Sequence, residues 1–193
     1  MKTAHPHLSR RRAAFTLAEL LVVITILGIL MALTFGGMRF ALQSGYEKKT
    51  VAQIAAMKSG LERFHADHGA YPLSTDANEG SKILYAALSG DTNYDGEITD
   101  ADVELDWFNN GASGRKAKAY LGELINADSQ QGWTVEENGS IYIIDGFGNR
   151  LQYLADPSST EMWNAPDHYD FWSFGRDDQL DPEVKENQWI TNW

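Results

Sequence analysis

One apolar run near the start of the chain limits what the chain can fold into. Residues 15–35 hold a single charged residue, Glu19. As a helix rising 1.5 Å per residue, the run would be about 31 Å long, which matches the hydrocarbon core of a bilayer. Three arginines at residues 10–12 precede it, and basic residues favour the cytoplasmic side of a membrane. The run therefore predicts one membrane-spanning helix, with the chain after Phe35 on the opposite side.

The carboxylate of Glu19 needs an explanation, because a charge near the bilayer centre costs roughly 2.5–3.5 kcal/mol or more. The basic leader, Phe15, Thr16, Glu19 and the apolar run together resemble the N-terminal signal of type IV pilins and type II secretion pseudopilins. In that family a prepilin peptidase cuts the leader just before a Phe, the new N-terminal residue is methylated, and a Glu stands fifth. The resemblance implies cleavage between Ala14 and Phe15, with N-methylation of Phe15. Ala14 replaces the usual Gly, so we expect slower cutting; the alternative is an uncleaved signal anchor.

Cleavage would give Glu19 a partner. The cut creates an α-amine at Phe15, and a carboxylate can pair with an amine in a low-dielectric environment. If helices pack side by side in a filament, Glu19 of one copy can meet Phe15 of its neighbour. We therefore expect Glu19 to act in assembly and to set the axial register.

The composition excludes several kinds of function. The leader, residues 1–14, takes with it four of the 16 basic residues and none of the 27 acidic ones, so the mature net charge is −15. Such an acidic chain should not bind nucleic acid through phosphate contacts, but it suits divalent cations. The chain has no Cys, which excludes disulfides and Cys-based metal or nucleophile chemistry. No hydrolase or zinc-protease motif is present, so we expect no enzymatic activity.

The helix should continue beyond the membrane through residues 36–68. Apolar residues recur there at spacings of three and four, which predicts one buried helix face; they are Val51, Ile54, Met57, Leu61 and Phe64. Gly69 and Pro72 should end the helix. His65 and His68, three residues apart near this end, could hold a metal, but no third ligand is evident, and a polar last turn that suits the helix dipole is the simpler interpretation.

A second informative stretch is residues 91–102, DTNYDGEITDAD. It fits an EF-hand type calcium loop, in which oxygen ligands stand at fixed positions around a Gly at the sharp turn. The predicted ligands, in loop order, are Asp91, Asn93, Asp95, Glu97 through its backbone carbonyl, Thr99 and Asp102. Asp at the last position, where many EF-hands carry Glu, resembles dockerin modules. The alternative is an Asp/Asn/Gly turn that needs no ion.

The remaining pattern predicts an α+β head with short helices and a roughly three-stranded antiparallel sheet. The expected helices are residues 81–89, capped by Ser81, a helix that Thr99 starts through Val103, Leu105 and Trp107, and residues 115–127. The expected strands are a short one at 133–135, a hairpin of 141–144 with 150–154, and a strand at 168–174.

The later half of the chain also resembles the major pseudopilin of type II secretion. Three parts of the sequence carry this resemblance: Asp145–Asn149 followed by Gln152 and Tyr153, the residues Asp170, Ser173, Gly175 and Asp177, and the last residues, Ile190–Trp193. Compared with members of that family, residues 80–118 look like an insertion that carries the calcium loop. The family's acidic tail loop holds a structural calcium, so Asp177 and Asp181 are candidate ligands. Pro182 excludes an EF-hand turn there, and a solvated acidic loop is equally consistent.

The resemblance implies three parts: a cleaved leader (1–14), a membrane and filament-core helix (15–35) and a periplasmic head (36–193). It predicts a structural subunit of a periplasmic pseudopilus that drives export by a type II secretion system, anchored by one pass in the inner membrane. Expected partners are further copies, other pseudopilins, the prepilin peptidase, the inner-membrane secretion platform and the membrane. The alternatives are a type IV pilus or DNA-uptake pilin and, from another class, a membrane-anchored calcium-dependent binding module.

Overall fold

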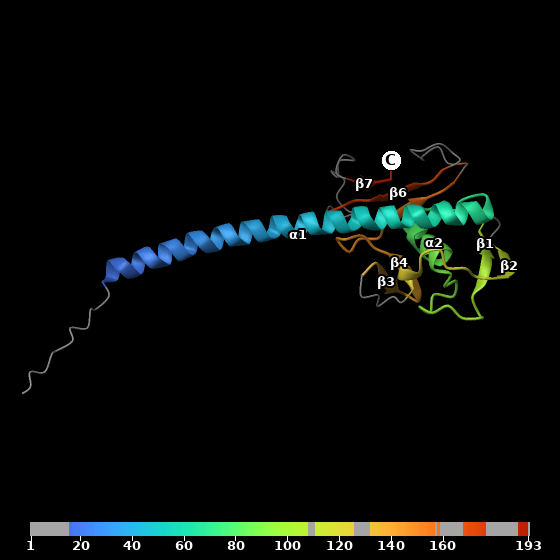
Figure 1. Ribbon diagram of the computed structural model, residues 1–193, viewed down its shortest axis with the longest axis horizontal. Helices are drawn as coiled ribbons and strands as arrows, with labels where there is room; N and C mark the ends of the chain where they lie inside the picture. Colours follow the sequence, from blue (N-terminus) through green and yellow to red (C-terminus); the bar gives the residue numbers. More distant parts are fainter. Residues whose placement is uncertain are drawn as a thin grey trace, which may run out of the picture. The chain divides into compact units, whose positions relative to one another are not determined.

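The computed structural model describes residues 16–107, 111–125, 132–156, 158, 168–176 and 189–192 (Figure 1). The chain forms two compact units, Met1–Leu42 and Gln43–Trp193. Ala14 and Phe15, on either side of the predicted cut, lie outside the described residues, as does the leader.

One α-helix, α1 (Leu17–His68), contributes to both units. In the first unit its residues Leu17–Phe35 are long and apolar enough to cross a membrane, and none of this stretch is buried. A helix that faces lipid on all sides carries exposed apolar side chains on every face, as this stretch does. This agrees with the predicted span, by length and composition.

Within the second unit, the head, α1 is amphipathic as predicted. Ile54, Met57, Leu61 and Phe64 are buried in the core, and Gly69, at φ +80°, ends the helix by donating its N–H to the carbonyl of His65 (2.7 Å). Val51 is an exception, because 55% of it is exposed. The predicted stripe is therefore wrong at its first residue.

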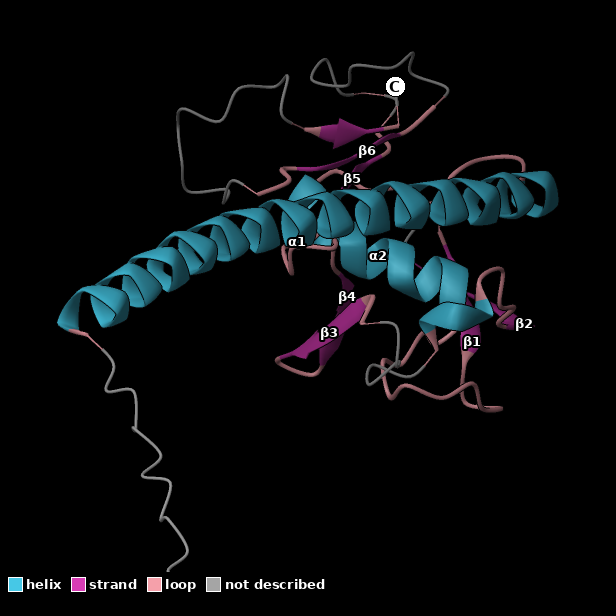
Figure 2. Ribbon diagram, turned by 60° about the vertical axis from the view of Figure 1, so that its left-hand side comes forward, coloured by secondary structure: helices cyan, strands magenta, loops and turns pink. Residues whose placement is uncertain are grey.

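The second helix, α2 (Ala77–Ser89), packs beside α1 in the head (Figure 2). It begins four residues before the predicted start, because Asp76 is its N-cap and accepts a hydrogen bond from the backbone N–H of Asn78 (2.9 Å). The predicted cap, Ser81, lies inside the helix and is buried, so that prediction was wrong. The helix ends at Gly90 in the left-handed conformation (φ +82°).

The described part of the head contains three small antiparallel sheets. Strand β1 (Val103–Asp106) pairs with β2 (Gly111–Lys116), and β3 (Thr134–Glu137) pairs with β4 (Ser140–Ile143). The third sheet has the order β5 (Gln152–Leu154), β6 (Asp170–Ser173) and β7 (Ile190–Thr191). Figures 1 and 2 show this sheet on one side of the head part of α1, with α2 and the two hairpins on the other. The predicted α+β class with a three-stranded sheet is confirmed.

Two predicted helices are wrong. Val103 and Leu105 lie on strand β1, which follows the calcium-loop segment directly. Residues 115–127 hold the end of β2 and a short 3₁₀ helix, η1 (Gly122–Leu124), where they are described. The backbone N–H groups of Tyr120 and Leu121 bond to the carbonyl of Leu88 on α2 (2.8 and 2.9 Å) instead of bonding within a helix.

The predicted hairpin of residues 141–144 with 150–154 is also only partly right. These segments are joined by a tight turn and one isolated bridge between Ile144 and Arg150. The main partner of β4 is β3, and that of β5 is β6. The predicted strands near 133–135 and 168–174 are present as β3 and β6.

Candidate assembly and calcium sites

Glu19 forms a reciprocal cap at the start of α1. Its Oε2 accepts hydrogen bonds from the backbone N–H and the hydroxyl of Thr16 (both 2.9 Å), and its own N–H donates to Thr16 Oγ1 (3.3 Å). This is a capping box, which satisfies two backbone donors that a helix start leaves free. The Thr-x-x-Glu spacing signals it in the sequence, yet we predicted only the intermolecular role. Glu19 is solvent-exposed, so its carboxylate stays accessible to a further donor.

The first half of the predicted calcium loop has the expected sharp turn. Gly96 has φ +83°, which only Gly adopts readily, and its N–H donates to Asp91 Oδ2 (2.8 Å). The same oxygen accepts from the hydroxyl of Tyr85 on α2 (2.7 Å). Asp91 is completely buried. The carboxylate at the first loop position is therefore held firmly at the end of α2.

Asp102, at the last loop position, closes the loop onto its beginning. Its Oδ1 accepts from the N–H groups of Thr92 (2.9 Å) and Asn93 (3.3 Å), and its Oδ2 accepts from the N–H of Thr99 (2.8 Å). Burial raises the pKa of Asp102, but these backbone donors outweigh it, so the pKa lies below its usual range. The carboxylate is thus kept ionised at the inner end of the loop.

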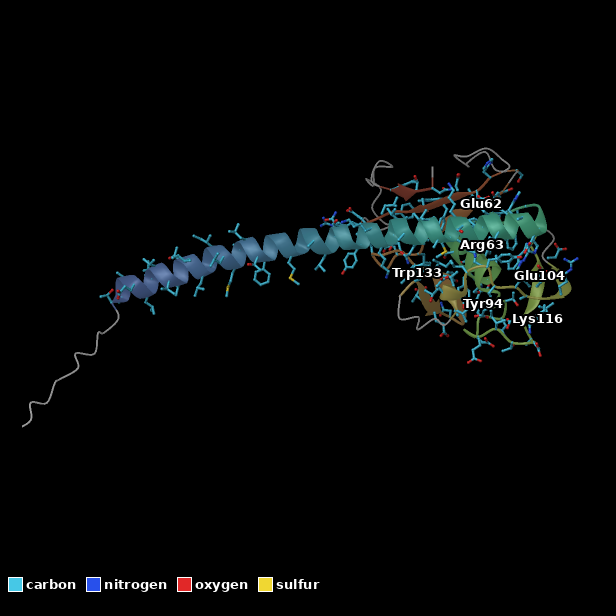
Figure 3. The ribbon with its side chains drawn as sticks, in the orientation of Figure 1. Glu62, Arg63, Tyr94, Glu104, Lys116 and Trp133 are labelled. Carbon is cyan, nitrogen blue, oxygen red and sulfur yellow. The ribbon has the colours of Figure 1, made fainter. Side chains whose placement is uncertain are left out.

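The middle of the loop is more exposed and held by its own side chains. Asn93 donates from Nδ2 to Asp95 Oδ2 (2.9 Å), and Asp95 Oδ1 accepts from the N–H of Glu97 (2.9 Å). Tyr94, labelled in Figure 3, adopts φ +62° and stacks on Tyr85 with ring centroids 6.1 Å apart. The loop thus has a fixed backbone with oxygen-bearing side chains along it.

The structure brings the six predicted ligand residues into one loop, but it does not arrange them as a closed cage. The carboxylates of Asp91 and Asp102 face backbone N–H groups. Among the described residues no three His, Asp or Glu side chains are grouped closely enough to hold a metal. Calcium binding stays a prediction, supported by a donor set made only of oxygen. The other candidates, Asp177 and Asp181, lie outside the described residues.

The two histidines near the end of α1 have separate partners. His68 Nε2 lies 2.5 Å from Glu104 Oε1 on β1, and its ring stacks on Phe64. The ring of His65 packs against Tyr71, with centroids 4.6 Å apart. These contacts anchor strand β1 to the helix end and favour the structural interpretation over a metal site.

The segments that carry the resemblance to the major pseudopilin meet in space. In the turn at residues 145–149, Asp145 Oδ1 accepts from the N–H groups of Phe147 (2.8 Å) and Asn149 (2.9 Å), and its Oδ2 accepts from the hydroxyl of Ser173 on β6 (2.6 Å). Burial raises the pKa of Asp145. Asn149 in turn donates from Nδ2 to the carbonyl of Gly175 (3.0 Å). Asp145 therefore joins the turn to the three-stranded sheet, a role that we did not predict.

The same turn is fitted closely onto α1. Gly146 donates its N–H to Thr50 Oγ1 (2.9 Å), and a Cβ at Gly146 would lie 2.2 Å from the carbonyl oxygen of Tyr46. Phe147 meets the ring of Tyr46 edge-on, at 5.7 Å between centroids. The turn therefore fixes the helix to the sheet within the head.

Comparison with known proteins places a family motif at the N-terminus. Residues 9–35 match the prokaryotic N-terminal methylation motif. Type II secretion system core protein G of Aeromonas hydrophila is 36% identical over 63 residues, 33% of this chain and 44% of that protein. The same-named protein of Dickeya chrysanthemi is 35% identical over 65 residues (34% and 42%), and that of Vibrio cholerae is 30% identical over 70 residues (36% and 48%).

The similarity is partial in extent. The chain spans less than half of the length of each of these three relatives. No solved structure matches the chain. The similarity therefore covers about a third of the chain.

Proposed function

We propose that this chain is a structural subunit of the pseudopilus of a type II secretion system, stored in the inner membrane with its head in the periplasm. The observation that carries the proposal is the apolar helix start: a methylation motif over residues 9–35, with Glu19 four residues after Phe15. The partial similarity to core protein G of three bacteria supports a pseudopilin over a type IV pilin. The proposed role is assembly, without catalysis.

In this proposal, cleavage by the prepilin peptidase frees the amine of Phe15 for pairing with Glu19 of a neighbouring copy. An ammonium buried without a partner is strongly unfavourable, so a copy without this carboxylate should not be incorporated. Further copies, other pseudopilins and the inner-membrane platform are the partners that the function requires. The capping box keeps the Glu19 carboxylate near the helix start, where the neighbour's amine would arrive.

Replacement of Glu19 by alanine tests the proposal. Glu19→Ala should leave membrane insertion intact, because the helix becomes more apolar, and should abolish filament assembly. Thr16→Ala is the matched control: it removes the capping partner but keeps the carboxylate, so assembly should continue. Filaments are counted in sheared fractions from cells that hold the secretion machinery. Normal filaments from Glu19→Ala would exclude the pairing, whereas equal loss in both variants would mean that Glu19 acts only as a cap.

We also propose that the loop at residues 91–102 binds calcium. The support is the ligand spacing, the turn at Gly96 and the two carboxylates, Asp91 and Asp102, held at the inner end of the loop. The side chains of Asn93, Asp95 and Thr99, with the carbonyl of Glu97, would complete the oxygen shell, and water would fill the remaining positions. The structural effect of calcium would be to neutralise the carboxylates and tighten the inserted segment.

Thermal unfolding with and without calcium tests this loop. An ion that binds only the folded state adds about 2.7 kcal/mol at a hundredfold excess over Kd, which is roughly 5–10 °C for a protein of this size. Asp95→Asn should remove most of the gain. Asp100→Asn is the matched control, because Asp100 lies in the same loop but pairs with Lys116 (2.8 Å) and is not a predicted ligand. No melting shift at millimolar calcium would refute the site.

A further inference from the structure

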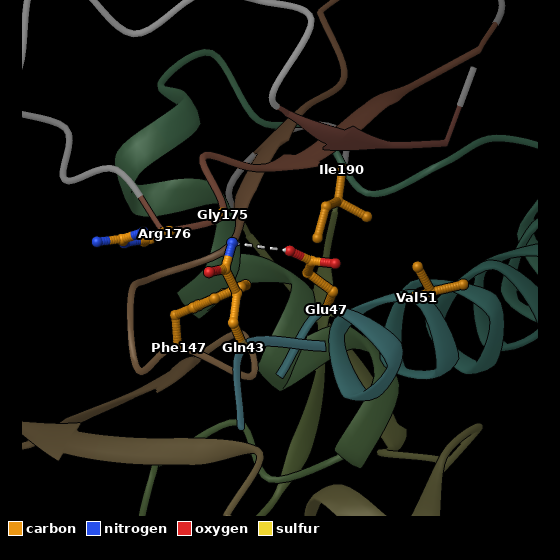
Figure 4. Close-up of a pocket in the computed structure, with 7 residues that line it drawn as sticks. All are labelled: Gln43, Glu47, Val51, Phe147, Gly175, Arg176 and Ile190. Atoms are coloured by element: carbon orange, nitrogen blue, oxygen red, sulfur yellow. Dashed lines mark hydrogen bonds between the residues drawn. The ribbon is translucent and has the colours of Figure 1, made fainter. Parts of the chain in front are cut away.

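An open pocket lies in the head beside α1 (Figure 4). It has a volume of about 510 Å³ and is lined by Gln43, Glu47, Val51, Phe147, Gly175, Arg176 and Ile190. Glu47 and Val51 come from α1, and Figure 4 shows Arg176 on the far side, with its guanidinium directed away from Glu47. The pocket therefore carries an acid on its helix wall and a base at its far rim, and its lining includes the apolar side chains of Val51, Phe147 and Ile190.

Both charges of the pocket lack a counter-ion among the described residues. Glu47 accepts a hydrogen bond from the Gln43 amide (3.2 Å, dashed in Figure 4), and neither Glu47 nor Arg176 forms an ion pair with a described residue. Val51, which was expected inside the core, lines the pocket instead and is 55% exposed. A carboxylate beside an apolar wall suits a lysine, whose methylene stem packs on apolar surface while its ammonium reaches the acid.

The complementary charges occur on the same face of α1. Lys58 follows Glu47 by eleven residues, which at 3.6 residues per turn is close to three full turns, so both point the same way about 16 Å apart along the axis. Lys58 is exposed and forms no ion pair with a described residue. Glu62 follows one turn later, is also exposed, and accepts one hydrogen bond from Tyr71 (3.2 Å). Lys58 and Glu62 on this face thus complement the charges of Glu47 and Arg176 at the pocket.

We propose that the pocket at Glu47 receives Lys58 of a second copy of this chain, with Glu62 of that copy directed to Arg176. The contact joins two different patches, so it is head-to-tail and leaves each copy with one free patch for the next. Copies joined this way would be shifted by about 16 Å along the helix axis, so they are not the two copies joined by Phe15 and Glu19, which are offset by four residues or about 6 Å. The inference rests on the proposed function, since it supplies a head contact for the filament, and it uses no residue of the membrane helix.

Cysteine cross-linking tests the contact in full-length chains assembled in cells. The native chain has no Cys, and a disulfide needs Cα atoms about 4.4–6.8 Å apart. Cysteines at Glu47 and Lys58 of one helix are too far apart to join, so any disulfide between them links two copies. Glu47→Cys with Lys58→Cys should give a ladder of cross-linked multimers on a non-reducing gel. Glu47→Cys with Ser59→Cys is the control, because Ser59 is exposed but points about 100° away.

A charge swap gives an independent readout. Glu47→Lys and Lys58→Glu should each lower the yield of filaments roughly tenfold, because like charges then meet at the interface. The double variant should recover most of the yield. If native chains form filaments but the Glu47–Lys58 pair cross-links no better than the Ser59 control, or if both single variants assemble normally, the contact is wrong and the filament function stands. If native chains form no filaments, the function itself fails and the contact with it.

Discussion

Replacing Gly146 by alanine should separate the turn at residues 145–149 from α1 and lower the melting temperature of the head. The added Cβ would lie 2.2 Å from the carbonyl oxygen of Tyr46 and 2.9 Å from Thr50 Oγ1. The first atom belongs to a helix backbone that cannot move aside cheaply. The turn must therefore shift, and the hydrogen bond from Gly146 to Thr50 (2.9 Å) is lost with it.

The size of the effect follows from two contributions. A lost hydrogen bond costs about 0.5–1.5 kcal/mol, and overpacking a close contact costs about 1–3 kcal/mol. The sum is about 2–4 kcal/mol, or roughly 5–15 °C in melting temperature for a protein of this size. Tryptophan fluorescence of the full-length chain in detergent micelles measures it, because all six tryptophans lie at or after Trp107 and report on the head alone.

Gly122→Ala is the matched control for this experiment. Gly122 is exposed, and a Cβ there would meet nothing within 4 Å, so its melting temperature should change by less than about 2 °C. An unchanged melting temperature in Gly146→Ala would refute the close fit of the turn onto the helix. Equal losses in both variants would refute it too, because the effect would then not come from the contact with α1.

Three further predictions use other parts of the chain. Ala14→Gly should speed leader removal and Ala14→Leu should block it, as the ratio of precursor to mature chain on a gel would show; equal processing of all forms would mean that the cut lies elsewhere. Ser81→Ala should raise the melting temperature slightly, because Ser81 Oγ is buried without a hydrogen-bond partner among the described residues and such a group costs about 1–3 kcal/mol; a lower melting temperature would refute this reasoning. Burial raises the pKa of Asp102, but its backbone hydrogen-bond donors lower it by more, so the net pKa lies below the usual value. The ionised form therefore adds stability above the unfolded pKa of about 3.9, and this is lost as the pH falls through the lower folded pKa. In calcium-free buffer, Asp102→Asn should melt with less dependence on pH in that acid range, and an unchanged pH dependence would refute the assignment.

Local patterns predicted the elements whose partners are close in the sequence. The repeat of apolar residues and the stop at Gly69 predicted α1 and its end, and the spacing in residues 91–102 predicted the turn at Gly96. The capping box of Thr16 and Glu19 was equally local and could have been predicted from its spacing. Such features depend on neighbouring residues alone.

Distant partners explain the wrong predictions. The segment around Tyr120 and Leu121 has the apolar spacing of a helix, but its N–H groups bond to Leu88, more than 30 residues earlier, and that partner cannot be seen in a local pattern. Asp145 accepts a hydrogen bond from Ser173, 28 residues later, and a partner at that distance is equally invisible in a local pattern. Val51 fits the buried stripe by spacing, yet it lines an open pocket.

The chemical state of the mature N-terminus separates a filament subunit from a simple membrane anchor most directly. Mass spectrometry of the chain isolated from membranes of cells with the secretion machinery measures it. We expect a chain that lacks residues 1–14, begins at Phe15 and carries one methyl group on its α-amine. A chain that keeps residues 10–14, or an unmethylated start at another residue, would contradict the pseudopilin function, because Glu19 would then have no amine of Phe15 with which to pair.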